Sequence, residues 1–213
     1  MIRKNENSIT LFFLFSKTPE EEKIRKELLK KVAEQFKVLP LPLKLYKQSS
    51  TSISFASKNK LIALSFRKPI RFTYWIKGTN AEIEQFNDII NATSKFLNNI
   101  MAEFSETIEL ESEIELPLSD GTHLNTARFV NNQLLTNVHN KIGINLKVNA
   151  LAFEFEYGEH KNSIVAVDEG RILVFKLSRK LSGRLPLDVL NSEKNHALKL
   201  ADLLNQIEKI EAC

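Results

Sequence analysis

Apolar residues recur along this chain with two different spacings. Short apolar runs and stretches with every second residue apolar predict β-strands, whereas a spacing of three and four residues predicts amphipathic helices. In the N-terminal half, strands are expected at 8–16, 51–56, 61–66 and 70–77. Helices are expected after the start signals at 18–22 and 78–80, with apolar stripes from Ile24 to Phe36 and from Ile83 to Phe104. Residues 38–43 contain two prolines and are expected to be an extended connector.

The C-terminal half repeats this order of elements. Strands are expected at 107–116, 145–157, 162–167 and 171–177, and helices at 122–142 and from Ser192 onward. Both halves, 1–105 and 106–213, thus have the order β-α-β-β-β-α, without residue-by-residue identity. We predict an α+β protein with two antiparallel sheets, each covered by helices on one face. The two sheets could join edge to edge into one curved sheet or form separate domains.

Charge is distributed unevenly between the two halves. Residues 1–105 hold 18 Lys and Arg against 10 Asp and Glu, whereas residues 106–213 hold 12 against 16. A basic half suggests nucleic acid or an acidic protein as partner, and opposite charges in one chain also suggest contact between copies, hence a homo-oligomer. Because 22 of the 30 basic residues are lysine, bidentate recognition by arginine has few candidates.

Several kinds of chemistry lack a signature in this sequence. The single cysteine, Cys213, cannot form a disulfide framework, and the apolar run at 9–15 is too short to span a bilayer. We therefore expect a cytoplasmic protein that does not engage a membrane. The six glycines are scattered, so no phosphate-binding loop is expected. The histidines show no metal-ligand spacing, and each is expected at the surface or at a helix cap. They are His123, His139, His160 and His196.

The most unusual segment is the alternating run Ile108–Leu116, in which every second residue is glutamate. Strand geometry predicts that Glu109, Glu111, Glu113 and Glu115 project from one face, as Glu154 and Glu156 do on a later strand. If these strands are neighbours, the second sheet has an acidic outer face. Such a face could hold a divalent metal through Glu109, Glu111, Glu113, Glu154 and Glu156, or it could be a solvated face that discourages edge aggregation.

The corresponding segment of the first half is basic and aromatic. Candidate nucleic-acid-binding residues are Arg67, Lys68, Arg71, Trp75 and Lys77, of which the last three share one face of the strand at 70–77. A tryptophan between cations could stack on a base while the cations contact phosphates. Alternatively, Trp75 is half-buried under a helix or in an interface, because the neighbouring strands are not expected to add a second exposed aromatic side chain.

Three functional hypotheses follow from these patterns, and a small-ligand pocket between the sheet and the helices is a fourth possibility that the sequence leaves open. The first is a non-enzymatic module, without a cofactor, that binds nucleic acid through its basic N-terminal half. The second is an interaction or self-assembly module in which the oppositely charged halves meet between molecules. The third is a metal-dependent enzyme that uses the glutamate-rich face. The sequence favours the first over the other two, and it identifies no catalytic residue.

Overall fold

The structure, a computed structural model, describes residues 7–15, 22–38, 43–67, 70–101, 108–117, 151–167, 172–181 and 185–211. The strands in these ranges are β1 (Asn7–Phe15), β2 (Lys44–Gln48), β3 (Ser52–Ser57), β4 (Lys60–Ser65), β5 (Ile70–Gly78), β6 (Ile108–Pro117), β7 (Leu151–Tyr157), β8 (His160–Val167) and β9 (Ile172–Leu181). The helices are α1 (Glu22–Val38), α2 (Asn80–Met101) and α5 (Val189–Glu211). The protein therefore belongs to the α+β class that the sequence predicts.

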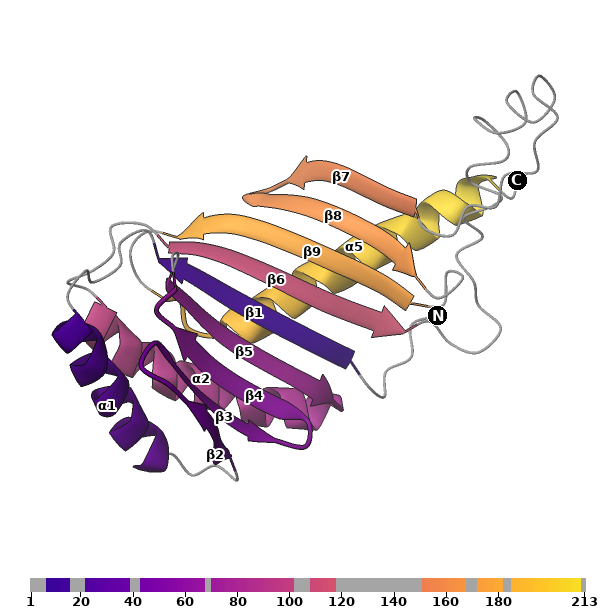
Figure 1. Ribbon diagram of the computed structural model, residues 1–213. Coiled ribbons are helices and arrows are strands. Elements are labelled where there is room, and N and C mark those ends of the chain that lie inside the picture. The colour runs from indigo at the N-terminus through magenta and orange to yellow at the C-terminus, as the bar shows by residue number, and fades with distance from the viewer. Residues whose placement is uncertain are drawn as a thin grey trace, which may run out of the picture.

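All of these strands belong to one antiparallel sheet (Figure 1), with the order β2-β3-β4-β5-β1-β6-β9-β8-β7. In its middle, β1 pairs with β5 on one side and with β6 on the other. The β1–β6 pairing runs from Ser8 opposite Glu115 to Phe15 opposite Ile108. It therefore joins the strands of the N-terminal half directly to those of the C-terminal half. Of the two arrangements left open by the sequence, the structure has the edge-to-edge one.

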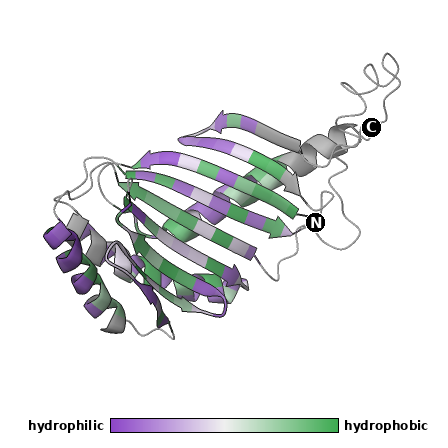
Figure 2. Ribbon diagram, in the orientation of Figure 1, coloured by the Kyte–Doolittle hydropathy of each residue, from purple (hydrophilic) through white to green (hydrophobic). Residues whose placement is uncertain are grey.

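Alternation along the strands gives the sheet two different faces, visible as alternating colours along the ribbons in Figure 2. In β1, the odd-numbered residues from Ile9 to Phe15 are buried, whereas Thr10, Phe12 and Leu14 are half-buried. The same alternation runs through β5 and β6. A shift in register by one residue would move every core side chain to the other face, so this pattern fixes how the strands pair.

The three helices cover the buried face of the sheet. Phe36 of α1 stacks on Phe55 of β3, with 4.9 Å between the ring centroids. Helix α2 contacts β5, and α5 contacts α2, β1 and β6; Figure 1 shows both of these helices running behind the sheet. Within the described ranges no helix covers the opposite face, and its side chains are half-buried or exposed in most positions.

Helix α2 begins at the predicted capping segment. The carboxylate of Glu82 accepts hydrogen bonds from the backbone N–H of Thr79 at 2.8 Å and from its hydroxyl at 3.1 Å. In return, Thr79 Oγ1 accepts the N–H of Glu82 at 3.4 Å, which completes a capping box. The predicted apolar stripe is confirmed as buried at Ile83, Phe86, Ile90 and Thr93. Its later members, from residue 97 on, lie outside the described side chains.

A buried hydrogen bond ties α2 to the sheet. The hydroxyl of Thr93 donates to the carbonyl of Ile89 at 2.8 Å, so the hydroxyl of Tyr74 must donate to Thr93 Oγ1, 2.7 Å away. Tyr74 is fully buried between the rings of Phe72 and Phe86. This burial raises the pKa of the Tyr74 hydroxyl far above its ordinary value, so it stays a neutral donor.

One strand was missed by the sequence prediction. Residues 44–48 follow the proline-containing connector and form β2, at the edge of the sheet beside β3. All five residues of β2 are exposed, so alternating burial does not mark this strand. The N-terminal half therefore contains β-α-β-β-β-β-α, with one strand more than predicted.

Three boundaries in the described part of the C-terminal half differ from the prediction by two residues or more. Strand β8 begins at His160 rather than 162, and β9 continues to Leu181 rather than 177 because residues 178–181 pair with the start of β6. Helix α5 begins at Val189 rather than Ser192, since Val189 and Leu190 are fully buried in the core. The helix predicted at 122–142 and the start of the strand predicted at 145–157 lie outside the described residues. The repeat of layout therefore stays a prediction.

Among the helices that the structure describes, none combines the length and the apolar character needed to cross a bilayer.

Candidate functional site

The open face of the sheet, opposite the helices, carries the side chains that alternate with the core residues. On β1 these are Ser8, Thr10, Phe12 and Leu14, and on β5 they are Arg71, Thr73, Trp75 and Lys77. On β6 they are Glu109, Glu111, Glu113 and Glu115. Both groups singled out in the sequence, the basic and aromatic group and the glutamates, therefore lie on one face of a single sheet.

Two aromatic side chains are neighbours on the open face. Phe12 is directly opposite Thr73, so Arg71 and Trp75 are its diagonal neighbours on β5. The guanidinium carbon of Arg71 lies 5.1 Å from the centroid of the Phe12 ring, which is within cation–π range. Phe12 and Trp75 are both half-buried, so neither is fully covered.

Phe12 adds a second, half-buried aromatic side chain beside Trp75, where the sequence led us to expect no second exposed one. The apolar run at 8–16 predicts a strand but does not tell which of its two faces the helices cover. In the structure only the odd-numbered residues of β1 enter the core, and Phe12 points to the open face. Trp75 lies on this same face, where no described helix covers it.

The open face of β1–β5 is basic among the residues that the structure describes. Lys44 and Lys47 of the edge strand are opposite Ala56 and Ser54, which places them on the same face as Arg71 and Lys77. None of these four cations forms an ion pair in the described part of the chain, and no acidic residue there shares their part of the face. The side chains between β5 and β2 are mostly short; they are Ser52, Ser54, Ala56, Leu61, Ala63 and Ser65.

The remaining two candidates for nucleic-acid binding are placed differently. Arg67 is exposed in the turn that follows β4, beyond the rows of open-face side chains, and its backbone N–H donates to Ser65 Oγ at 3.4 Å. Lys68 lies outside the described residues. The structure thus brings Arg71, Trp75 and Lys77 together on one strand and leaves Arg67 at its periphery.

The other half of the open face carries both signs of charge, which corrects the predicted acidic face. Strands β9 and β8 separate β6 from β7, and they contribute lysines at register positions directly opposite glutamates. Lys180 is opposite Glu109, Lys176 is opposite Glu113, and Lys161 is opposite Glu156. Of these pairs, Lys176 and Glu113 form an ion pair of 3.8 Å. The alternation along each strand correctly placed the glutamates of β6 and of β7 on one face. The strand order, which the sequence does not give, places lysine-bearing strands between them.

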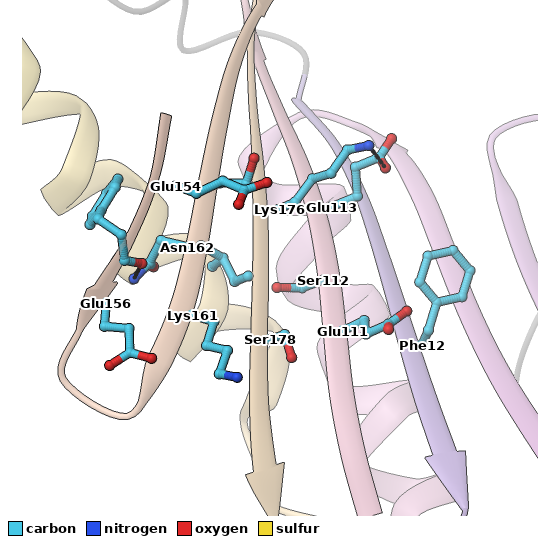
Figure 3. A pocket seen from close by; sticks show the side chains of 13 residues that line it. Phe12, Glu111, Ser112, Glu113, Glu154, Glu156, Lys161, Asn162, Lys176 and Ser178 are labelled. Atoms are coloured by element: carbon cyan, nitrogen blue, oxygen red, sulfur yellow. Dashed lines mark hydrogen bonds and ion pairs between the residues drawn. The ribbon is translucent and has the colours of Figure 1, made fainter. Parts of the chain in front are cut away.

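A hollow of about 620 Å³ lies on this mixed-charge half (Figure 3). Its lining contains four glutamates, Glu111, Glu113, Glu154 and Glu156, together with Lys161 and Lys176. Phe12 lines it from β1, so the hollow borders the aromatic pair. Its lining combines charges of both signs with apolar surface.

Four of the five carboxylates proposed as metal ligands line this hollow, but they approach it from separate strands. Two strands, β9 and β8, lie between the β7 residues Glu154 and Glu156 and the glutamates of β6. In the described ranges, no group of three carboxylate, imidazole or thiol side chains is close enough to hold a metal ion. The metal hypothesis therefore gains no support from this geometry.

The sequence prediction missed a buried carboxylate cluster on the helix side of the sheet, formed by Glu193 with Arg179, Ser112 and His160. Glu193 of α5 is completely buried. Its Oε1 lies 2.9 Å from Nη2 of Arg179 and 3.2 Å from Nε2 of His160. Its Oε2 accepts the hydroxyl of Ser112 at 2.9 Å. One carboxylate thus binds side chains from β6, β8 and β9, which fixes α5 against the sheet.

The two described histidines stack on each other beside this cluster, with 4.0 Å between the centroids of His160 and His196. Nε2 of His196 donates to Oδ1 of Asn162 at 2.9 Å, and Nδ2 of Asn162 donates to the carbonyl of His160 at the same distance. His160 is buried, contrary to its expected surface position, because β8 begins two residues earlier than predicted. His123 and His139 lie outside the described residues.

The buried carboxylate cluster is not arranged for nucleophilic catalysis. A nucleophilic serine needs a neighbouring base that can take its proton while the serine remains accessible to substrate. Ser112 is buried, and its hydroxyl donates to a carboxylate that Arg179 already neutralises. The cluster therefore serves the packing of α5. Among the described residues, the candidate binding side chains that solvent can reach lie on the open face.

Comparison with known proteins finds no matching family model, no matching curated protein and no matching solved structure.

Proposed function

We propose that this protein is a non-enzymatic module that binds single-stranded nucleic acid on the open face of β1–β5. The observation that supports this most is the register of β1 and β5, which places Phe12 and Trp75 diagonally adjacent with Arg71 beside them. Aromatic rings on an open sheet can stack on unpaired bases, whereas cations at the same level can contact the phosphates.

The distribution of charge gives the bound strand a direction across the sheet. Lys44 and Lys47 lie three inter-strand steps from β5, about 14 Å away at the usual strand spacing. The short side chains between them allow a backbone to pass close to the sheet. On the other side of β1, the glutamates of β6 repel phosphates. The bound nucleic acid is therefore expected to run from Phe12 across the sheet toward β2.

A titration monitored by tryptophan fluorescence tests this proposal, because Trp75 is the only tryptophan of the chain. Single-stranded oligonucleotides of DNA and RNA should quench Trp75 on stacking, and the affinity should fall steeply between about 50 mM and about 200 mM salt as counterion release predicts. A duplex of the same sequence should bind more weakly, since its bases are already stacked.

Matched variants separate this site from general attraction to a basic protein. Arg71→Ala should weaken binding and reduce the salt slope by about one, whereas Lys161→Ala removes the same charge from the other half of the open face and should leave both nearly unchanged. Phe12→Leu should weaken binding about fivefold or more, at about 1–3 kcal/mol for one stacked base. Equal effects of the Arg71 and Lys161 variants, or no quenching of Trp75 by any single strand, would contradict the proposal.

A further inference from the structure

The sheet ends in two edge strands, β2 and β7, whose outer sides pair with no other strand in the described part of the chain. Both edges also expose large apolar side chains. On β2, Leu45 is 52% exposed and Tyr46 is 76% exposed; on β7, Phe155 is 37% exposed and Tyr157 is 48% exposed. The free N–H and C=O groups of an edge strand are a template on which another strand can be added.

On the open face, the two edges carry opposite charges. A bulge between Leu45 and Lys47 allows Lys44 and Lys47 both to lie on the open face of β2. On β7, Glu154 and Glu156 lie on the open face, opposite Ser163 and Lys161 of β8. None of the four charged residues is in an ion pair among the described residues.

On the helix side, the same two edges carry apolar residues. Leu45 is opposite the buried Phe55, which places it on the helix side of β2. Phe155 and Tyr157 alternate with the glutamates and so lie on the helix side of β7. If β7 of one copy extends the sheet of another copy beside β2, lysines meet glutamates on one face and apolar side chains meet on the other.

We propose that copies of this chain join head to tail, with β7 of one molecule pairing with β2 of the next. Pairing of two β2 edges would oppose lysines, and pairing of two β7 edges would oppose glutamates, and like charges across strands are destabilising. Charge therefore selects the contact between unlike edges. This contact shares Lys44 and Lys47 with the proposed nucleic-acid site, but it does not depend on that proposal, because association of the protein alone is measured without nucleic acid.

Strand direction defines the geometry of the contact. Eight successive antiparallel pairings separate β2 from β7, so these two strands run in the same direction. A second copy with its open face on the same side therefore meets the first in a parallel pairing. Each added molecule leaves one free β2 and one free β7, so the assembly is an open row that lengthens with concentration and not a closed dimer.

A charge-swap experiment tests the proposal on the full-length chain. The molar mass measured by light scattering should increase with protein concentration at low salt and decrease at high salt, where surface charges are screened. The variant K44E/K47E has two acidic edges and the variant E154K/E156K has two basic edges, so each alone should remain monomeric. Their equimolar mixture should associate again, because every contact then joins unlike edges.

The control is K95E/K199E, which changes the same number of exposed lysines on α2 and α5 and should associate like the unmodified protein. Circular dichroism confirms that each variant is folded, which is expected because all the replaced side chains of β2 and β7 are exposed. The proposal is overturned if the unmodified protein is monomeric at every concentration and salt, or if either single-edge variant associates as well as the unmodified protein.

Discussion

Arg179 and Glu193 form an ion pair of 2.9 Å in which the carboxylate is shielded completely from solvent. A buried charge is tolerated only when its hydrogen-bonding capacity is used, and here Ser112 and His160 supply the remaining donors. Removal of one member of such a group leaves the charges and hydrogen-bonding atoms of the others without a partner inside the protein.

We therefore expect Glu193→Ala to destabilise the protein by about 3–5 kcal/mol, because Arg179 then keeps its charge without an acceptor in the core. The conservative variant Glu193→Gln retains an acceptor oxygen and should lose less. Urea denaturation followed by circular dichroism measures both. A loss below about 1 kcal/mol for the alanine variant would mean that the carboxylate contributes no more than a surface pair.

The histidine stack makes stability depend on pH. Burial lowers the pKa of His196, the neighbouring His160, Arg179 and Lys199 lower it further, and Glu193 opposes them. The unfolded chain therefore binds a proton at His196 more readily than the folded chain does. The contribution of neutral His196 is present above about pH 6.5 and is lost as the pH falls toward its lowered folded pKa.

Urea midpoints at pH 7.5 and pH 5.5 measure this dependence, which is expected to be smaller in His196→Gln. Glutamine keeps a donor for Asn162 but does not titrate. If the variant and the unmodified protein lose the same stability on acidification, the stack has no part in the acid sensitivity.

The capping box of α2 is a separate contributor to stability. Thr79→Ala removes the hydroxyl that accepts the N–H of Glu82 and donates to its carboxylate, and should cost about 1 kcal/mol. Thr79→Ser keeps the hydroxyl and is the matched control. Thermal unfolding should rank the alanine variant clearly below the other two; identical midpoints for alanine and serine would exclude a capping role.

Local periodicity predicted most of the framework correctly. The burial of alternate residues in β5 and β6 could be predicted because it depends only on the two-residue period of a strand. Strand β2 could not be found this way, since no face of it enters the core. Apolar residues on both faces of β1 concealed Phe12, because a sequence does not state which side of a strand the helices cover.

The buried carboxylate cluster has no local sequence signal. Ser112 and Glu193 are 81 positions apart and meet only because α5 crosses the sheet behind β6. The interleaving of Lys161 and Lys176 with the glutamates likewise depends on the strand order, in which β9 and β8 lie between β6 and β7. Such long-range relationships arise from the fold as a whole. The pattern of one strand therefore predicts which charged side chains share a face, but not which side chains of other strands lie beside them.

The central position of β1 determines how the molecule responds to being divided. A peptide ending near residue 105 would contain β1 and β5 but not β6, so one side of β1 would have no strand to pair with. The complementary peptide would contain β6 without β1, so β6 would also lack a partner on one side. Neither fragment is self-sufficient in this respect, although each carries a large share of the core. The chain should therefore melt in a single cooperative transition, and the two fragments should be able to reconstitute the protein when they are refolded together.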